Sequence, residues 1–256
     1  MKCINYCLLL IAFLFLGGIP AFSQENIGSL IEAAEQGNAD AQYYLGLSYY
    51  NGKGVAQDYA AAVSWWRKAA EQGNAEAQFC LGNCYCNGDG VTQDYAVAVS
   101  WFRKAAEQGN ALAQYNLGIS YYRGAGVVQD YAAALSWFRK AAEQGFVKAQ
   151  TELGSSYYNG EVVAQDRAAA ASWFRKAAEQ GDANAQYNLG LCYANGHGVA
   201  QDWAAAASWF RKAAEQGDAN AQYNLGLCYA NGHGVAQDWA AAASWFRKAA
   251  EQGDAN

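Results

Sequence analysis

The chain has 256 residues, of which 53% are apolar and only one is a proline, and its formal net charge is −6. An acidic chain with no basic block argues against nucleic acid and against anionic membrane surfaces as partners.

The first 23 residues are expected to form a secretory signal peptide. Lys2 supplies a positive start, residues 7–16 are an unbroken apolar run, and residues 21–23 fit a small-x-small cleavage site before Gln24. The run is too short to span a bilayer. An uncleaved anchor and a buried apolar strand are the alternatives. The sequence therefore predicts an exported chain, periplasmic or secreted, with no later segment that spans a membrane.

Residues 24–37 are expected to contain a lone second helix that covers the first repeat. Residues 33–37 have the sequence AAEQG, which recurs at residues 69–73. Atypical terminal units of this kind close the open apolar face of a repeat array.

From residue 38 to residue 253 the chain repeats a 36-residue pattern. Residues 181–216 recur without a difference at residues 217–252. A fixed period in the thirties indicates a stack of small units that share one core, because one such unit cannot bury enough apolar surface alone. Six repeats are predicted, followed by the start of a seventh at 254–256: 38–73, 74–109, 110–145, 146–181, 182–217 and 218–253.

The first half of each repeat predicts a helix, over residues 39–50 in repeat one. Asn38 is placed to cap it by accepting from free amides of the first turn. Gly46 recurs within the helix although glycine costs about 1 kcal/mol there relative to alanine, which indicates a close helix contact. Gly52 and Gly54 then predict a turn with positive φ.

The second half predicts a helix over residues 59–72, with Asp58 at its positive end. Trp65 recurs in all six repeats, and we expect this large aromatic side chain to fill the space between the helices. Gly73 ends the helix. Helix–turn–helix pairs of this kind predict an all-α fold, a right-handed α/α superhelical solenoid.

The pattern within a repeat resembles the Sel1-like repeat, a branch of the tetratricopeptide-like superfamily. The matching positions in repeat two are Ala77, Leu81, Gly82, Tyr85, Gly88, Gly90, Val91, Asp94, Trp101, Lys104, Ala105, Ala106 and Gly109. The resemblance implies an adaptor or scaffold, and bacterial members with signal sequences often act in the envelope or against host proteins. Some cysteine-rich relatives are associated with β-lactam or peptidoglycan-like ligands.

Positions that vary between repeats mark a candidate binding stripe on the first helices. Asp40, Tyr44, Leu47 and Asn51 share one helical face. We expect the stripe to face solvent on the concave side and to contact a protein or peptide; a glycan and a neutral surface are the alternatives. The candidate contact residues are Tyr44, Tyr50, Asn116, Tyr122, Glu152, Asn188 and Asn224.

Repeat four departs most from the pattern. Phe146 replaces the helix cap, Val162 replaces a loop glycine, and Arg167 stands where other repeats carry Tyr or Trp. Local drift and a bend or partner contact at this point are both compatible with these changes.

The remaining reactive residues favour structural roles. Cys84 occupies a position that holds Ser48 in repeat one, so we expect the cysteines to be small buried residues; a metal or a bridge among Cys80, Cys84 and Cys86 is the alternative. His197 and His233 lie between loop glycines and are expected to be exposed.

The sequence predicts no enzyme, no cofactor and no metal site. Ser64 and Lys68 are four residues apart, one more than the Ser-x-x-Lys spacing of penicillin-binding hydrolases. A hydrolase or β-lactam-binding protein, and a structural spacer in an envelope assembly, remain as alternative functions.

Overall fold

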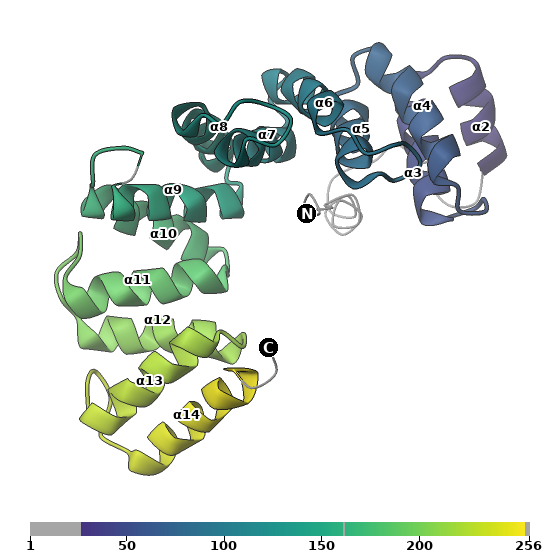
Figure 1. Cartoon of the computed structure of the whole chain (residues 1–256). Helices are drawn as coiled ribbons and strands as arrows, with labels where there is room; N and C mark the ends of the chain where they lie inside the picture. Colours follow the sequence, from purple (N-terminus) through teal and green to yellow (C-terminus); the bar gives the residue numbers. More distant parts are fainter. Residues whose placement is uncertain (1–26, 161, 254–256) are drawn as a thin grey trace. The chain divides into compact units, whose positions relative to one another are not determined.

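The structure is a computed structural model that describes residues 27–160 and 162–253; the predicted signal peptide and residues 254–256 lie outside them. The described residues form thirteen helices and no strand, which confirms the all-α prediction (Figure 1). The helices are α2 (Ile27–Glu35), α3 (Ala39–Asn51), α4 (Tyr59–Glu71), α5 (Ala75–Asn87), α6 (Tyr95–Glu107), α7 (Ala111–Arg123), α8 (Tyr131–Glu143), α9 (Val147–Asn159), α10 (Arg167–Glu179), α11 (Ala183–Asn195), α12 (Trp203–Glu215), α13 (Ala219–Asn231) and α14 (Trp239–Gly253).

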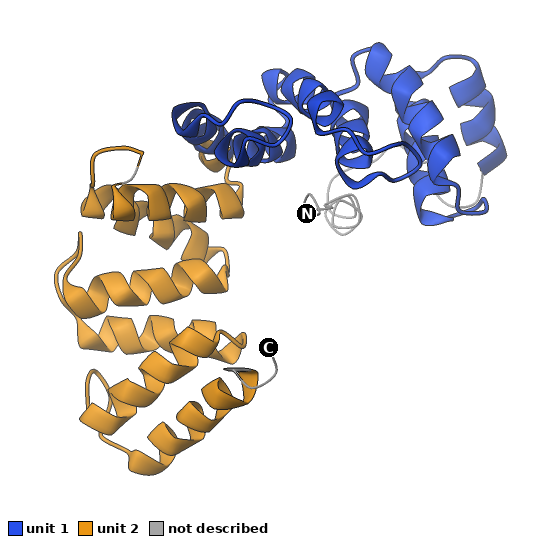
Figure 2. Ribbon diagram, in the orientation of Figure 1, with its two compact units in different colours: residues 1–141 blue, residues 142–256 orange. Residues whose placement is uncertain are grey.

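The chain divides into two compact units, with the boundary after Ala141 within α8 (Figure 2). In the first unit each helix from α2 to α7 packs against the next, and Phe138 of α8 contacts Tyr115 of α7 with ring centroids 5.6 Å apart. In the second unit α9 to α14 pack in the same consecutive manner. Each unit is therefore a solenoid of helix pairs, while the right-handed superhelical sense stays a prediction.

Side-chain caps and left-handed glycines set the helix ends, as predicted. Asn38 Oδ1 accepts from the backbone N–H of Ala41 at 2.8 Å, and Asp58 Oδ1 accepts from Ala61 at 2.9 Å. Gly52 ends α3 with φ 67°, a conformation that glycine adopts at little cost. Phe146 begins α9 without a side-chain cap. The observed bounds of α3 and α4 therefore lie within one residue of the bounds predicted for repeat one.

The aromatic side chain that fills the space between paired helices is Trp66, not Trp65 as predicted. Trp66 is fully buried, and a Cβ added at Gly46 would lie 2.5 Å from its ring. Trp65 is half-buried, with the Lys68 ammonium 3.9 Å from its ring centroid. Position 66 shares a helix face with the buried Ala62 and Ala70, whereas position 65 lies at the edge of that face. Its equivalents Phe102, Phe138, Phe174 and Phe210 are also buried.

Glutamine side chains join successive repeats. Gln42 Nε2 donates to the carbonyl of Ala34 in the preceding helix at 3.0 Å, and its Oε1 accepts from Gln72 Nε2 at 2.8 Å. Gln42 is only 4% exposed, and its bond to Ala34 is buried, whereas the bond from Gln72 is partly exposed. The bond to the preceding alanine carbonyl recurs at Gln78, Gln114, Gln150, Gln186 and Gln222.

A second recurring hydrogen bond links the second helix of one repeat to the first helix of the next. Arg67 of α4 donates to the Tyr85 hydroxyl of α5 at 2.7 Å, and Arg211 of α12 donates to Tyr229 of α13 at 2.8 Å. At the start of the array, Leu30 and Ala34 of α2 pack against α3. Together these contacts set how each repeat sits on its neighbour within a unit.

Candidate partner-binding surface

The seven predicted contact residues do not form one uniformly exposed stripe. Four of them lie in the first compact unit and three in the second. Tyr122 is exposed, while Tyr50 and Asn116 are buried. The expectation of a solvent-facing stripe is therefore wrong for these two residues. The remaining four are half-buried: Tyr44, Glu152, Asn188 and Asn224.

Tyr50 is buried between the second helix of its own repeat and the loop of the next repeat. Its ring lies 4.9 Å from that of Tyr59 and 5.3 Å from that of Trp66, and its hydroxyl donates to Asp89 Oδ2 at 3.0 Å. Asp89 belongs to the loop of repeat two. Tyr50 therefore stabilises the junction between two repeats, and its variation along the chain does not mark exposure.

Asn116 is buried at another junction. It is 4% exposed, and its Nδ2 donates to Asn83 Oδ1 at 3.4 Å, which joins α7 to α5. Asn83 is 2% exposed. Buried amides of this kind pair with each other because an unpaired polar group away from water is costly. The burial of Asn83 could not be predicted from the sequence, since no periodic pattern distinguishes this residue.

Asn188 and Asn224 sit at equivalent half-buried positions on α11 and α13. Each donates from Nδ2 to the carbonyl four residues earlier, Asn184 and Asn220 respectively, at 2.9 Å. These bonds hold the amide groups in one orientation on the helix surface. Preoriented amides are suited to adaptable hydrogen bonding with a polypeptide.

Tyrosine hydroxyls on the first helices lie close to carboxylates. Burial raises the pKa of Tyr44, and the negative charges of Asp40 and Glu76 raise it further. Burial likewise raises the pKa of Tyr187, followed by the effect of Asp218. The hydroxyl groups of Tyr44 and Tyr187 therefore stay protonated at neutral pH. The nearby carboxylates make the electrostatic potential around these hydroxyls negative.

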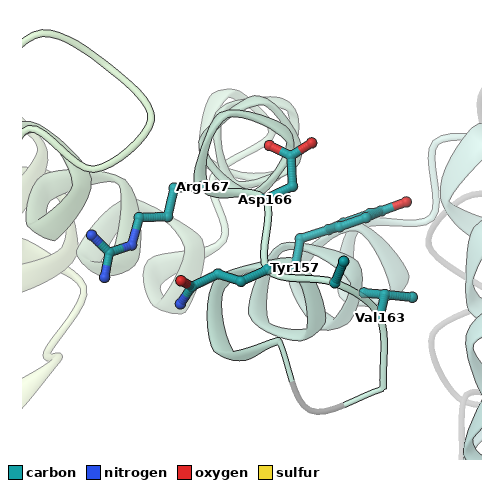
Figure 3. Close-up of a pocket in the computed structure, with 6 residues that line it drawn as sticks. Tyr157, Val163, Asp166 and Arg167 are labelled. Carbon is teal, nitrogen blue, oxygen red and sulfur yellow. The ribbon is translucent and has the colours of Figure 1, made fainter.

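The loop of repeat four lines an open hollow of about 770 Å³. Figure 3 shows Arg167 pointing away from Tyr157 and Val163. The Asp166 carboxylate caps α10 by accepting from Ala169 N–H at 2.9 Å, so it is engaged in holding the helix start.

A smaller cavity of about 250 Å³ lies among α11, α12 and α13. Its walls combine aromatic and aliphatic side chains with three asparagines and one histidine, and one predicted contact residue, Asn224, is among them. The lining residues are Leu191, Ala194, Asn195, Trp203, Phe210, Asn224, Leu227, Cys228, Asn231 and His233.

Cys80, Cys84 and Cys86 are buried, as predicted, but Cys86 is disulfide-bonded, which the sequence did not predict. Cys192 and Cys228 are free thiols, and burial raises the pKa of Cys192 to about 11 and that of Cys228 in the same direction. A raised pKa keeps the thiol protonated, which does not suit a nucleophile or a metal ligand. Within residues 27–160 and 162–253, no group of three His, Cys, Asp or Glu could hold a metal ion.

The loop histidines differ from one another. His197 is half-buried, contrary to expectation, because its Nδ1 hydrogen-bonds with the Tyr158 hydroxyl at 2.9 Å. His233 is exposed as predicted, and its ring lies 4.4 Å from that of Trp203.

The repeated lysines have a structural partner. Each lies over the ring of the tryptophan three residues earlier, at 3.9–4.1 Å from the centroid. This cation–π contact recurs in all six repeats and shields one face of each half-buried tryptophan. None of the helices in the described part of the chain is long and apolar enough to cross a membrane.

Comparison with protein families identifies the repeat. The family model of the Sel1 repeat matches six consecutive segments, residues 39–74, 75–110, 111–146, 147–182, 183–218 and 219–254. Sel1 repeats commonly serve as scaffolds for protein–protein interaction. Among curated proteins no match is found.

Two crystal structures are similar to this chain. A protective antigen present in uropathogenic Escherichia coli strains, displaying an SLR fold, has a TM-score of 0.85 and 44% identity over 89% of this chain and 49% of its own. A Sel1 repeat protein from Oxalobacter formigenes has a TM-score of 0.75 and 41% identity over 88% of this chain and 65% of its own. The chain thus spans about half and about two-thirds of these two structures. With six matched repeats and the same helical architecture, the chain belongs to the Sel1 repeat family.

Proposed function

We propose that this protein is an exported scaffold that binds a protein or peptide partner through the first helices of its repeats. The observation that carries the proposal is the contrast between invariant and variable positions on these helices. The invariant glutamines and small residues of these helices are buried in the repeat junctions. By contrast, the position shared by Tyr44, Glu152, Asn188 and Asn224 varies between repeats, and these four residues are half-buried.

The chemistry of these residues favours a polypeptide. Tyrosine and asparagine supply broad contact area and adaptable hydrogen bonds at little entropic cost. The acidic side chains near Tyr44 and Tyr187 favour a partner surface rich in donors or in positive charge. A glycan partner has no support from the comparisons.

Export is part of the proposal and rests on residues 1–23, which have the three regions of a signal peptide. The similar E. coli protein is described as a protective antigen, which agrees with a location that the immune system can reach. A periplasmic or secreted location follows from the same reasoning.

A non-catalytic role is preferred to hydrolysis. The recurring lysines lie over tryptophan rings, and the thiols of Cys192 and Cys228 have raised pKa values. A catalytic unit needs a distinctive polar cluster in a pocket. No observation favours the hydrolase, β-lactam-binding or spacer alternatives over binding.

The test uses residues 24–256 as bait for envelope or host proteins, with charge-matched variants. In the first, Asn188 and Asn224 on the first helices are both changed to Lys. In the control, the exposed Ser172 and Ser208 of the second helices α10 and α12 are both changed to Lys. We expect the first variant to lose capture of a reproducible partner and the control to keep it, with equal helicity by circular dichroism. Equal capture by both variants contradicts the proposed surface.

A further inference from the structure

Ala194, near the end of α11, stands where repeats one, three and four carry a tyrosine. The backbone at the four positions is held in the same way. The carbonyls of Tyr50, Tyr122, Tyr158 and Ala194 each accept from the Nε2 of a loop glutamine seven residues later, at 2.8–2.9 Å. The Cβ of Ala194 is therefore directed as the tyrosine side chains are.

In repeats one and four the tyrosine ring fills the space between its own second helix and the loop of the next repeat. The ring of Tyr158 lies 6.4 Å from that of Phe174, and its hydroxyl hydrogen-bonds with His197 at 2.9 Å. Tyr50 is held between aromatic rings and Asp89 in the same manner. The position is thus built for a phenol, with aromatic walls and a polar residue at the far end.

Repeat five has equivalent residues around this position but lacks the tyrosine. Trp203 corresponds to Tyr59, Phe210 to Phe174, and His233 to both Asp89 and His197. With only a methyl group at Ala194, a cavity of about 250 Å³ is left between these residues. A cavity of about 150 Å³ in another protein is large enough to bind benzene. The space therefore accommodates a six-membered ring with a substituent.

We propose that this cavity binds the phenol ring of a tyrosine side chain presented by the partner. The ring would stack against Trp203 and Phe210 and direct its hydroxyl toward His233, as the internal tyrosines do toward the same loop position. Asn195, Asn224 and Asn231 also line the cavity and offer amide groups to a peptide backbone. This inference rests on the proposed scaffold function and names the chemistry of its ligand.

The first experiment measures binding of p-cresol, the tyrosine side-chain analogue, to residues 24–256 by NMR titration or calorimetry. We expect saturable binding, with toluene about tenfold weaker because it lacks the hydroxyl and so loses one hydrogen bond. The variant Ala194→Tyr should lose p-cresol binding and melt at a higher temperature, because its own ring fills the cavity. The matched control is Ala230→Tyr, which makes the same change in an identical local sequence at a residue that does not line the cavity.

A second arm separates a tyrosine on a polypeptide from a free phenol. N-acetyl-L-tyrosinamide should bind at least as tightly as p-cresol, because its amides reach the asparagines around the cavity. Absence of saturable p-cresol binding, or binding that Ala194→Tyr leaves unchanged, overturns the inference. Binding of p-cresol without binding of the amide overturns the polypeptide source. These outcomes leave the proposed function intact, because that function is also tested by Asn188→Lys alone, at a residue that does not line the cavity, with capture of the partner protein as the readout.

Discussion

Gly190 lies so close to the Phe210 ring that the direction in which Gly190→Ala changes the free energy of unfolding can be predicted. A Cβ at Gly190 would lie 2.6 Å and 2.7 Å from two carbons of the Phe210 ring, about 1 Å inside the usual contact of roughly 3.5–4.0 Å. Phe210 is 1% exposed, so its ring cannot move into solvent and can yield only toward the cavity that it lines. Overpacking of this kind costs about 1–3 kcal/mol. The better helix propensity of alanine offsets at most about 1 kcal/mol.

Gly190→Ala should therefore lower the free energy of unfolding by up to about 2 kcal/mol. The measurement is urea unfolding of residues 24–256 followed by circular dichroism and tryptophan fluorescence. Gly226→Ala is a matched control, because its sequence context is identical but its neighbour Phe246 is half-buried and can shift. We expect a smaller loss of stability there.

A double-mutant cycle tests the cause. Phe210→Leu removes the ring atoms that the new methyl group meets, so Gly190→Ala in that background should be neutral or stabilising by up to about 1 kcal/mol. If Gly190→Ala stabilises the otherwise unchanged protein, or destabilises it equally with Leu at position 210, the explanation from ring contact is refuted.

Three further predictions follow from the junctions, the thiols and the lysines. Gln186→Met removes a buried hydrogen bond to Ala178 and a partly buried one from Gln216, and should cost about 2 kcal/mol in urea unfolding; a loss under about 0.5 kcal/mol contradicts a structural role for the glutamine. Because burial raises the pKa of Cys192 to about 11, its reaction with a disulfide reagent in the folded protein should stay slow at pH 8 and accelerate only toward strongly alkaline pH; rapid labelling at pH 8 argues against this burial. Lys212→Met removes an exposed cation–π contact and should change stability by no more than about 1 kcal/mol, as read from the thermal midpoint.

The sequence predicted what depends on neighbouring residues. The 36-residue period predicted the helix pairs. The capping residues Asn38 and Asp58 predicted where the two helices of repeat one begin, because a cap bonds only to amides of its own first turn. Gly52 gave the end of the first helix for the same local reason.

What the sequence did not predict depends on how one repeat is rotated against the next. Variation at Tyr50 and Asn116 indicated exposure, but both lie in junctions whose partners, Asp89 and Asn83, are more than thirty residues away. Recurrence of tryptophan at the Trp65 position indicated the space-filling side chain, although recurrence does not show which edge of a helix is buried. Gln42 recurs equally and was overlooked, because a polar residue within an apolar pattern suggests solvent.

The repeated glutamine bonds have a consequence for how such a chain changes in length. Every junction presents the same donor to the same acceptor, so excising or duplicating one 36-residue segment joins surfaces that already match. Unequal recombination within the gene can therefore add or remove a module without a new interface having to evolve. The identical residues 181–216 and 217–252 are what a duplication of this kind leaves behind.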